Sequence, residues 1–300
     1  MSSVDAALPA ARSREESILA GNLRDFLANR MSVAASLICL AFCLIAIFAP
    51  MLAPQNPYET DLLRRLQPPA WMDGGERGFW LGCDALGRDV LSRMIYGTRV
   101  SIMIGVAVVL LATVIGTTLG LLAGYLRGPV DIVIARVCDI LLGFPYLIFA
   151  IGLMAMMGPG LQNIILALCY KEWVLPCRVV RAETLAAREQ DYVEAARALG
   201  ASRWHIMRRE ILPNILSPVI VVATFRMAYI IIAEASLSFL GLGVQPPTAS
   251  WGSLVADGRA FLLDAWWVST FPGLAILALV LAINVASQGL RDAFDPRLSR

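Results

Sequence analysis

Several ionisable residues stand inside long apolar stretches of this sequence, where a charge is costly unless it has a use, and four of them lie deepest in the fourth and fifth stretches. Lys171 and Glu172 fall near the middle of one stretch, and Arg226 and Glu234 fall in the next. Charged groups at bilayer depth usually face a bundle interior, a water-filled cavity or one another. The four are therefore candidates for a solute pathway or for structural ion pairs, and both interpretations stay open. Adjacent helical residues point about 100° apart, so Lys171 and Glu172 are not expected to pair mainly with each other.

The sequence is poor in the residues that enzymes use for phosphate and metal chemistry. The single lysine, Lys171, stands in the context Cys-Tyr-Lys-Glu, whereas a P-loop ends in Gly-Lys-Ser or Gly-Lys-Thr. The single histidine, His205, excludes two-histidine zinc motifs, and no two cysteines form a Cys-x-x-Cys pair. We expect no catalytic residue, no metal ion and no cofactor. ATP hydrolysis, if it is used, must come from a separate subunit.

The composition points to a membrane as the solvent for most of the chain. Hydrophobic residues make up 58% of 300 positions and charged residues 16%, against about a quarter charged in soluble proteins. A net charge of +2 is too small to suggest nucleic acid as a partner. The apolar residues form runs near the length of about 20 that one helical crossing needs. These runs predict an all-α integral membrane protein of about six transmembrane helices, at 31–53, 100–126, 131–157, 161–180, 215–240 and 266–289.

Arginine placement predicts the orientation, because loops rich in basic residues stay in the cytosol. The segment between the fourth and fifth runs is rich in arginine, whereas the loop between the third and fourth has none. Both termini are therefore expected in the cytosol. The predicted organisation is a cytosolic tail, a first transmembrane helix, an extracytoplasmic loop, a core of five spans that includes a cytosolic loop at 182–213, and a cytosolic tail: 1–30, 31–53, 54–98, 99–289 and 290–300.

Three glycines in the second run stand four residues apart, at Gly116, Gly120 and Gly124. Small residues at this spacing form a low ridge along one helix face, and such a ridge lets two helix backbones approach closely. The pattern predicts tight packing of this helix against another and does not by itself indicate a function.

The cytosolic loop at 182–213 has the pattern of two helices joined at a corner. Asp191 followed three residues later by Glu194 is typical of a capping box, with Asp191 as the cap. Gly200 suits the left-handed residue that ends a helix. Ser202 can cap a second helix, which Pro213 is expected to stop. On these patterns alone, a solvated hairpin and a docking element for a partner are equally good interpretations.

The same loop resembles the EAA motif of permease subunits of bacterial ABC importers. One departure is Glu210, where that motif prefers an apolar residue. The resemblance implies that the loop is the coupling segment on which an ATPase subunit docks, and it assigns that role to the matching residues Glu194, Ala195, Ala196, Gly200, Leu212 and Pro213.

Further stretches resemble the dipeptide and oligopeptide permease family, most closely its C subunits. Cys83 replaces a threonine that is usual in the first of them, and Glu234 in the second is expected to serve helix packing. The resemblance extends over about residues 30 to 300, and the stretches that carry it are 81–93, 233–243, 245–247, 251–252 and 289–296.

This resemblance implies a type I ABC importer permease fold in the bacterial cytoplasmic membrane. Such a subunit pairs with a homologous second permease subunit, two cytosolic ABC ATPase subunits and an extracytoplasmic substrate-binding protein. Its substrates are dipeptides or oligopeptides, with glutathione, nickel chelates and opines as alternatives within the same importer type.

Two other classes of membrane protein remain as alternative functions. A stand-alone secondary transporter would need its own coupling-ion site, and an intramembrane enzyme would need a nucleophile near His205.

Overall fold

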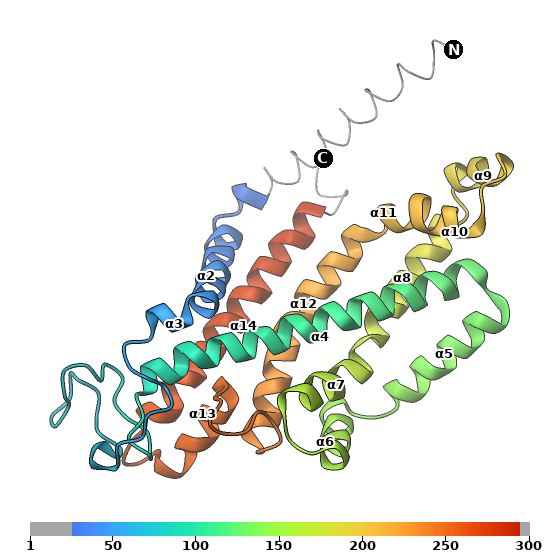
Figure 1. Cartoon of the computed structure of the whole chain (residues 1–300). Helices are drawn as coiled ribbons and strands as arrows, with labels where there is room; N and C mark the ends of the chain where they lie inside the picture. Colours follow the sequence, from blue (N-terminus) through green and yellow to red (C-terminus); the bar gives the residue numbers. More distant parts are fainter. Residues whose placement is uncertain (1–25, 295–300) are drawn as a thin grey trace.

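The apolar runs fold into helices that lie side by side in an elongated bundle (Figure 1). This computed structural model describes residues 26–294, and within that range the β pairing is limited to an isolated antiparallel bridge between Cys83 and Asp89. Helices that are long and apolar enough to cross a membrane are α2 (Arg30–Ile47), α4 (Val90–Leu126), α12 (Leu216–Phe239) and α14 (Trp267–Phe294).

The third apolar run is broken rather than straight. It forms α5 (Gly128–Leu142) and α6 (Tyr146–Met157), which meet at 90°. The prediction of one continuous helix over 131–157 is therefore wrong. Pro145 is the cause, because it has no N–H to donate and because it disfavours helical backbone at Phe144. Counted as one broken span, this pair raises the number of apolar spans in the described chain from four to five.

The fourth run is also divided, and it extends further than expected. Helix α7 (Leu161–Glu172) ends at Trp173, and α8 (Val174–Ala187) continues into the stretch assigned to the cytosolic loop. Neither helix reaches the 18 residues that a span by itself requires. Counted together as one crossing, α7 and α8 would bring the total from five to the predicted six. This crossing is less apolar than the others because it contains Lys171, Glu172, Arg178 and Arg181.

Helix α4 starts ten residues before its apolar run. The Asp89 side chain caps it by accepting a hydrogen bond of 2.8 Å from the Ser92 N–H. The apolar pattern missed this first part because it contains Arg93 and Arg99.

The glycine ridge packs α4 closely along α8, as its spacing predicts. A Cβ on Gly120 would lie 2.5 Å from the Cys177 carbonyl oxygen, and one on Gly116 would lie 2.6 Å from the Trp173 carbonyl oxygen. Both distances are shorter than any ordinary contact, so the two backbones can pass only because the side chains are missing. The remaining long helices pack around this pair, α12 against α4 and α14, and α14 against α2.

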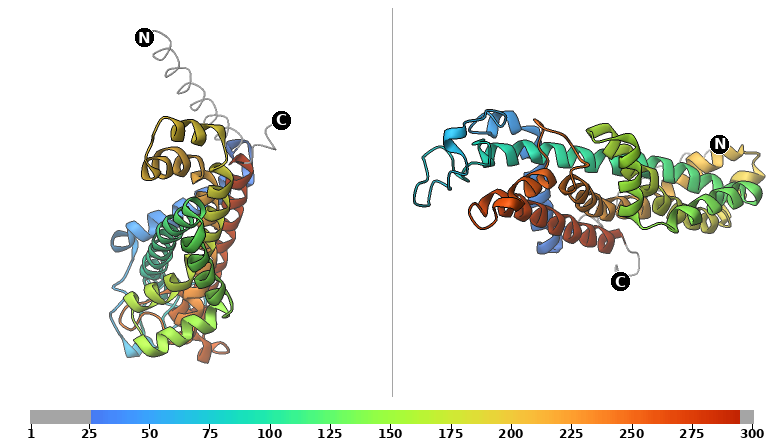
Figure 2. Two further views of the ribbon diagram at one scale, coloured as in Figure 1. Left: turned by 90° about the vertical axis from the view of Figure 1, so that its right-hand side faces the viewer. Right: turned by 90° about the horizontal axis from the view of Figure 1, so that it is seen from below.

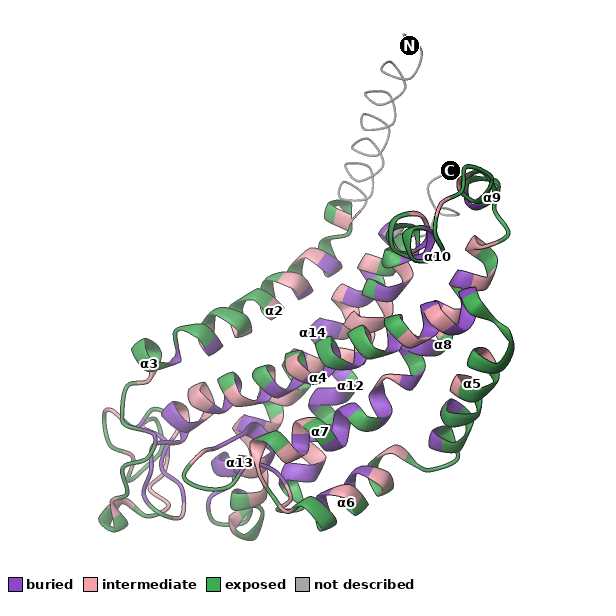
Figure 3. Ribbon diagram, turned by 45° about the vertical axis from the view of Figure 1, so that its right-hand side comes forward, coloured by how far each residue is buried: buried purple, intermediate pink, exposed green. Residues whose placement is uncertain are grey.

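Short elements complete the described chain at the two ends of the bundle. Figure 2 shows the loop that precedes α4 at one end and α9 at the other. Burial falls off outwards: α7 and α8 are largely covered, whereas α2 and α5 expose apolar side chains over much of their length (Figure 3). The short elements are α3 (Ala49–Leu52), α9 (Asp191–Ala198), α10 (Arg203–His205), α11 (Leu212–Asn214), α13 (Trp251–Gly258), a π-helical segment (Ile206–Ile211) and 3₁₀ turns at Leu62–Arg64 and Arg259–Phe261.

Candidate functional site

The first helix of the 182–213 loop begins one residue earlier than its capping pattern predicts. Gln190 is the N-cap residue and makes no side-chain cap bond, so Asp191 is the first helical residue and no capping box forms. The prediction of Asp191 as the cap is therefore wrong. Asp191 and Glu194 still stabilise the helix, because negative charge in the first turn opposes the positive end of the helix dipole. The Glu194 carboxylate is exposed and makes no ion pair among residues 26–294.

The corner of the loop is built as predicted, on Gly200. Its φ is +82°, in the left-handed region that residues with a Cβ rarely adopt. The Gly200 N–H donates to the Arg197 carbonyl at 3.0 Å, and the Ala201 N–H donates to the Ala196 carbonyl at 3.1 Å. This is the paired bonding of a Schellman motif. No heavy atom lies within 4 Å of where a Cβ would stand, so the backbone angle alone requires glycine here.

The second half of the loop confirms one prediction and corrects another. The Ser202 hydroxyl caps α10 by accepting from the His205 N–H at 3.2 Å. The helical backbone does not end at Pro213, however. It continues to Asn214 and turns at Ile215 before α12. The π-helical segment directly precedes the proline, and the Leu212 N–H donates to the Met207 carbonyl at its end.

A buried apolar cluster fixes the loop to the membrane helices. Val193 of α9 and Ile206 and Ile211 of the π-helical segment pack with Tyr125 of α4 and Val180 of α8. Each of these side chains is at least nine-tenths buried. A force applied to α9 is therefore transmitted to α4 and α8 through close-packed side chains, which have little freedom to yield.

The opposite face of α9 is free. Glu194, Ala195 and Leu199 are exposed, and Leu199 shows 88% of its surface. Ala196 is half-buried against the cluster, as is Leu212, and Pro213 is exposed on α11. The residues of the motif thus divide into an outward surface of low relief and an inward anchor.

Among the intramembrane charges, Glu172 and Arg226 come together. The Arg226 guanidinium of α12 donates to both carboxylate oxygens of Glu172 at the end of α7, with Nη2 to Oε2 at 2.7 Å. The same guanidinium lies over the Tyr229 ring, 4.2 Å from its centre. Glu172 is almost fully buried, so this pair joins two helices inside the bundle.

Lys171 points to a different partner, as the 100° between neighbouring helix positions requires. Its ammonium group donates to the Phe144 carbonyl, in the break between α5 and α6. That carbonyl precedes Pro145 and lies beyond the end of α5, where backbone oxygens lack helical partners. Lys171 is 8% exposed and ties α7 to the bend.

Glu234 serves helix packing in the structure. It is fully buried in α12 and accepts hydrogen bonds from Ser238 at 2.7 Å and from Ser101 of α4 at 3.1 Å. The Ser101 oxygen in turn accepts from the Trp251 N–H at the start of α13. The carboxylate therefore links three helices.

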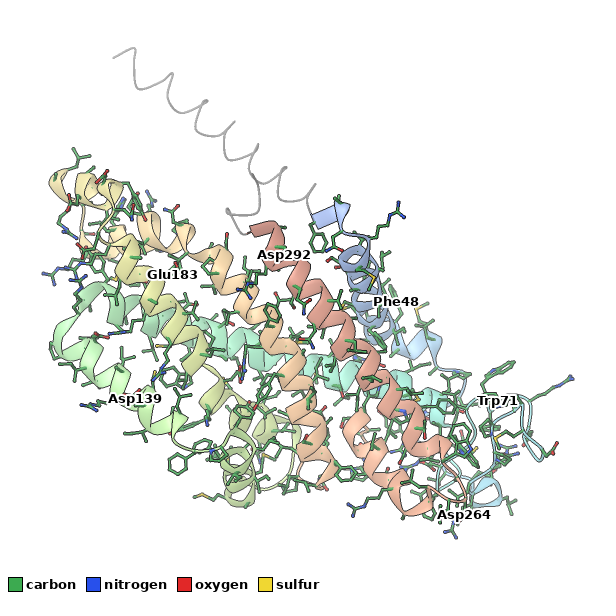
Figure 4. The ribbon with its side chains drawn as sticks, turned by 180° about the vertical axis from the view of Figure 1, so that it is seen from behind. Phe48, Trp71, Asp139, Glu183, Asp264 and Asp292 are labelled. Carbon is green, nitrogen blue, oxygen red and sulfur yellow. The ribbon has the colours of Figure 1, made fainter. Side chains whose placement is uncertain are left out.

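Sequence reasoning missed a charge network at the other end of the bundle. Asp84 accepts hydrogen bonds from Arg88, with Nε to Oδ2 at 2.8 Å, and from Arg93. Arg93 also reaches Asp257 of α13 at 3.4 Å. The signal available in the sequence is the close spacing of Asp84, Arg88, Asp89 and Arg93 in the 81–93 stretch. Figure 4 shows Trp71 and Asp264 at this end, with Glu183 of α8 toward the end that carries the 182–213 loop.

The chemistry available at these positions is structural and electrostatic. Burial, with the Asp89 and Asp84 carboxylates nearby, raises the pKa of the Cys83 thiol to about 12. Cys83 is therefore a neutral, unreactive thiol at physiological pH. Within residues 26–294, no three His, Cys, Asp or Glu side chains gather closely enough to hold a metal ion.

Comparison with known proteins identifies two matching families. The family described as "Binding-protein-dependent transport system inner membrane component" matches residues 116–300. The one described as "N-terminal TM domain of oligopeptide transport permease C" matches residues 17–69. Together they cover the first helix and most of the bundle.

Relatives of this chain are transport permeases by name. It is 42% identical to the di/tripeptide transport system permease protein DppC of Pseudomonas aeruginosa, over 92% of this chain and 91% of that one. It is also 42% identical to the glutathione transport system permease protein GsiD of Pectobacterium atrosepticum, over 92% and 90%. An inward-facing structure of the MetNI methionine ABC transporter matches with a TM-score of 0.58 at 19% identity, over 68% of this chain and 98% of that one.

Proposed function

Because this chain belongs to the family of binding-protein-dependent transport system inner membrane components, we propose that it moves short peptides through the bacterial cytoplasmic membrane. It is the permease subunit of an ABC importer. Short peptides are the substrate class, since relatives at this level of identity are named for dipeptides, di/tripeptides and glutathione. Glutathione, a nickel chelate or an opine is the alternative cargo of the same machinery.

One observation carries the proposed mechanism, namely the apolar cluster between α9 and the ends of α4 and α8. ATPase closure would push on the exposed Glu194 face of α9. Val193, packed against Tyr125 and Val180, would pass that movement to two membrane helices. The Gly200 corner would keep α9 and α10 at the angle that fits the ATPase surface. The chain would thus convert movement outside the membrane into rearrangement within it.

The expected assembly contains this chain, a homologous second permease subunit, two cytosolic ATPase subunits and an extracytoplasmic binding protein. Both termini and the 182–213 loop would lie in the cytosol, since that loop is rich in arginine. The segment between α2 and α4, with the Asp84 network, would then face outward and receive the binding protein.

Uptake by reconstituted vesicles tests this proposal. The full complex is placed in liposomes with a radiolabelled dipeptide and its binding protein outside, and ATP inside. Dipeptide should accumulate with ATP and stay outside when a non-hydrolysable analogue replaces it. Accumulation by this chain alone in ATP-free vesicles would favour a stand-alone secondary transporter instead.

A further inference from the structure

A pocket of about 470 Å³ lies between the end of α4 and the 182–213 loop. Its volume is within the range of small-molecule sites. Three arginines contribute to its walls, one from the residue that follows α8 and one from each of α9 and α10, together with apolar and aromatic side chains. The lining residues are Tyr125, Leu126, Arg188, Arg197, Ala201, Arg203 and Ile206.

The arginines of this pocket differ from their neighbours because they have no acidic partner within residues 26–294. Close by, Arg127 pairs with Glu189 at 2.5 Å, and Arg181 pairs with Asp131. Arg188, in contrast, donates to the Tyr125 carbonyl at 3.0 Å and lies over the Tyr125 ring.

Arg197 and Arg203 are exposed and have no ion-pair partner among residues 26–294. Three positive charges therefore line one pocket, to which the described part of the chain contributes no carboxylate. Such a group favours a ligand with several anionic oxygens.

The position of the pocket favours a ligand at the membrane surface. Tyr125 and Leu126 are the last residues of α4, and Arg127 follows them directly, so they stand where the apolar sequence of this span ends. Leu126 is 38% exposed there, next to the basic groups. Basic pockets at the cytosolic ends of membrane helices are suited to anionic lipid headgroups.

The geometry also separates this pocket from the surface offered to the ATPase. Val193 and Ala196 face the apolar cluster, and Arg197 follows on the side of α9 that turns toward α4. Glu194 and Ala195 lie on the opposite, outward face. A ligand in the pocket would therefore bind beneath α9 and leave its outward face free.

We propose that this pocket binds the phosphate group of an anionic phospholipid of the cytosolic leaflet. The headgroup holds α9 and α10 against the end of α4 and neutralises the charge that Arg188, Arg197 and Arg203 bring together. This binding goes beyond the proposed transport function, and only its placement on the cytosolic side rests on the orientation proposed above. A measurement of lipid retention therefore separates failure of this proposal from failure of the peptide-transport proposal.

Native mass spectrometry of the purified full chain tests the proposal. The protein is mixed in detergent with phosphatidylglycerol, with phosphatidylcholine of the same acyl chains, or with inorganic phosphate. The pocket variant is Arg197→Gln with Arg203→Gln. The control variant is Arg208→Gln with Arg209→Gln, which removes the same charge from the same loop at exposed residues outside the pocket.

The unaltered chain should retain phosphatidylglycerol in preference to phosphatidylcholine. The pocket variant should bind it about ten- to thirty-fold more weakly, as loss of two surface arginines implies, and the control variant should bind it nearly normally. Equal weakening of lipid binding in both variants would show that the total positive charge of the loop, and not the pocket, determines binding. Displacement of the lipid by millimolar phosphate would identify a soluble anion as the ligand. Either of these two results would overturn the proposal.

Discussion

Arg226 of α12 holds Glu172 of α7 through both of its carboxylate oxygens, although the two residues are 54 positions apart in the chain. Glu172 exposes 1% of its side chain and Arg226 exposes 25%. The pair therefore lies at the edge of the buried bundle, and it joins the end of α7 to α12, the helix that follows the 182–213 loop.

Removing one member of this pair should be worse than removing both. Arg226→Met leaves a buried carboxylate without its cation, which costs on the order of 3–5 kcal/mol in comparable sites. Adding Glu172→Gln should recover most of that loss, because the remaining buried group is neutral. Unfolding of the purified chain in mixed micelles measures both. Equal stability of the single and double variants would show that the pair is not coupled.

Lys171→Met should impair uptake while leaving assembly nearly normal. The ammonium group reaches the Phe144 carbonyl in the bend between α5 and α6, so its loss frees the bend without opening the core. Dipeptide uptake and complex yield are measured side by side. Normal uptake by this variant would show that Lys171 has no role in transport.

Gly120→Leu should disrupt the packing of α4 on α8. A Cβ there would stand 2.5 Å from the Cys177 carbonyl oxygen, so the helices must separate, at a cost of about 3 kcal/mol or more. Gly152→Leu is the matched control, because Gly152 lies within α6 and nothing stands within 4 Å of its Cβ position. Thermal stability in detergent should fall for the first variant alone. A similar loss in both would point to helix propensity and not to close packing.

Asp84→Ala should destabilise the end of the bundle that carries the segment between α2 and α4 far more than Asp257→Ala does. Asp84 is nearly buried and neutralises Arg88 and Arg93, whereas the Asp257 side chain is 45% exposed. We expect a loss of about 3 kcal/mol or more for Asp84→Ala and less than about 1 kcal/mol for Asp257→Ala. Limited proteolysis of the segment between α2 and α4 provides the readout. Equal protection in the two variants would contradict this ranking.

Length and hydropathy were sufficient to predict the straight spans. The runs at 215–240 and 266–289 match α12 and α14 to within five residues, because continuous apolar helix is the stable form in a bilayer. In the 31–53 run, α2 ends at Ile47, six residues early, and the chain continues after Phe48 as the short helix α3. The 90° bend was not predicted, because proline is tolerated inside many membrane helices and Pro145 alone does not say which outcome applies.

Local signals predicted the corner of the 182–213 loop, at Gly200 and Ser202, but they misplaced the start of α9 and the end of the helical segment near Pro213. Gly200 and Ser202 act through their own backbone and neighbours, so their roles follow from residue type. Asp191 was misplaced by one position, because Asp is favourable both as a cap and in the first turn. The Glu172–Arg226 pair was beyond prediction, since it depends on how two helices are aligned across 54 residues.

Substitution of Gly200 in the reconstituted complex tests the central claim most directly. Gly200→Val requires a β-branched residue at φ +82°, which strains the corner although nothing blocks the side chain. Gly200→Asn is the control, because asparagine accepts left-handed backbone. Substrate-stimulated ATP hydrolysis should be lost with valine, together with ATPase-subunit retention, and largely kept with asparagine, while the permease pair stays assembled in both. Full stimulation in the valine variant would contradict the account and leave the 182–213 loop as a solvated hairpin.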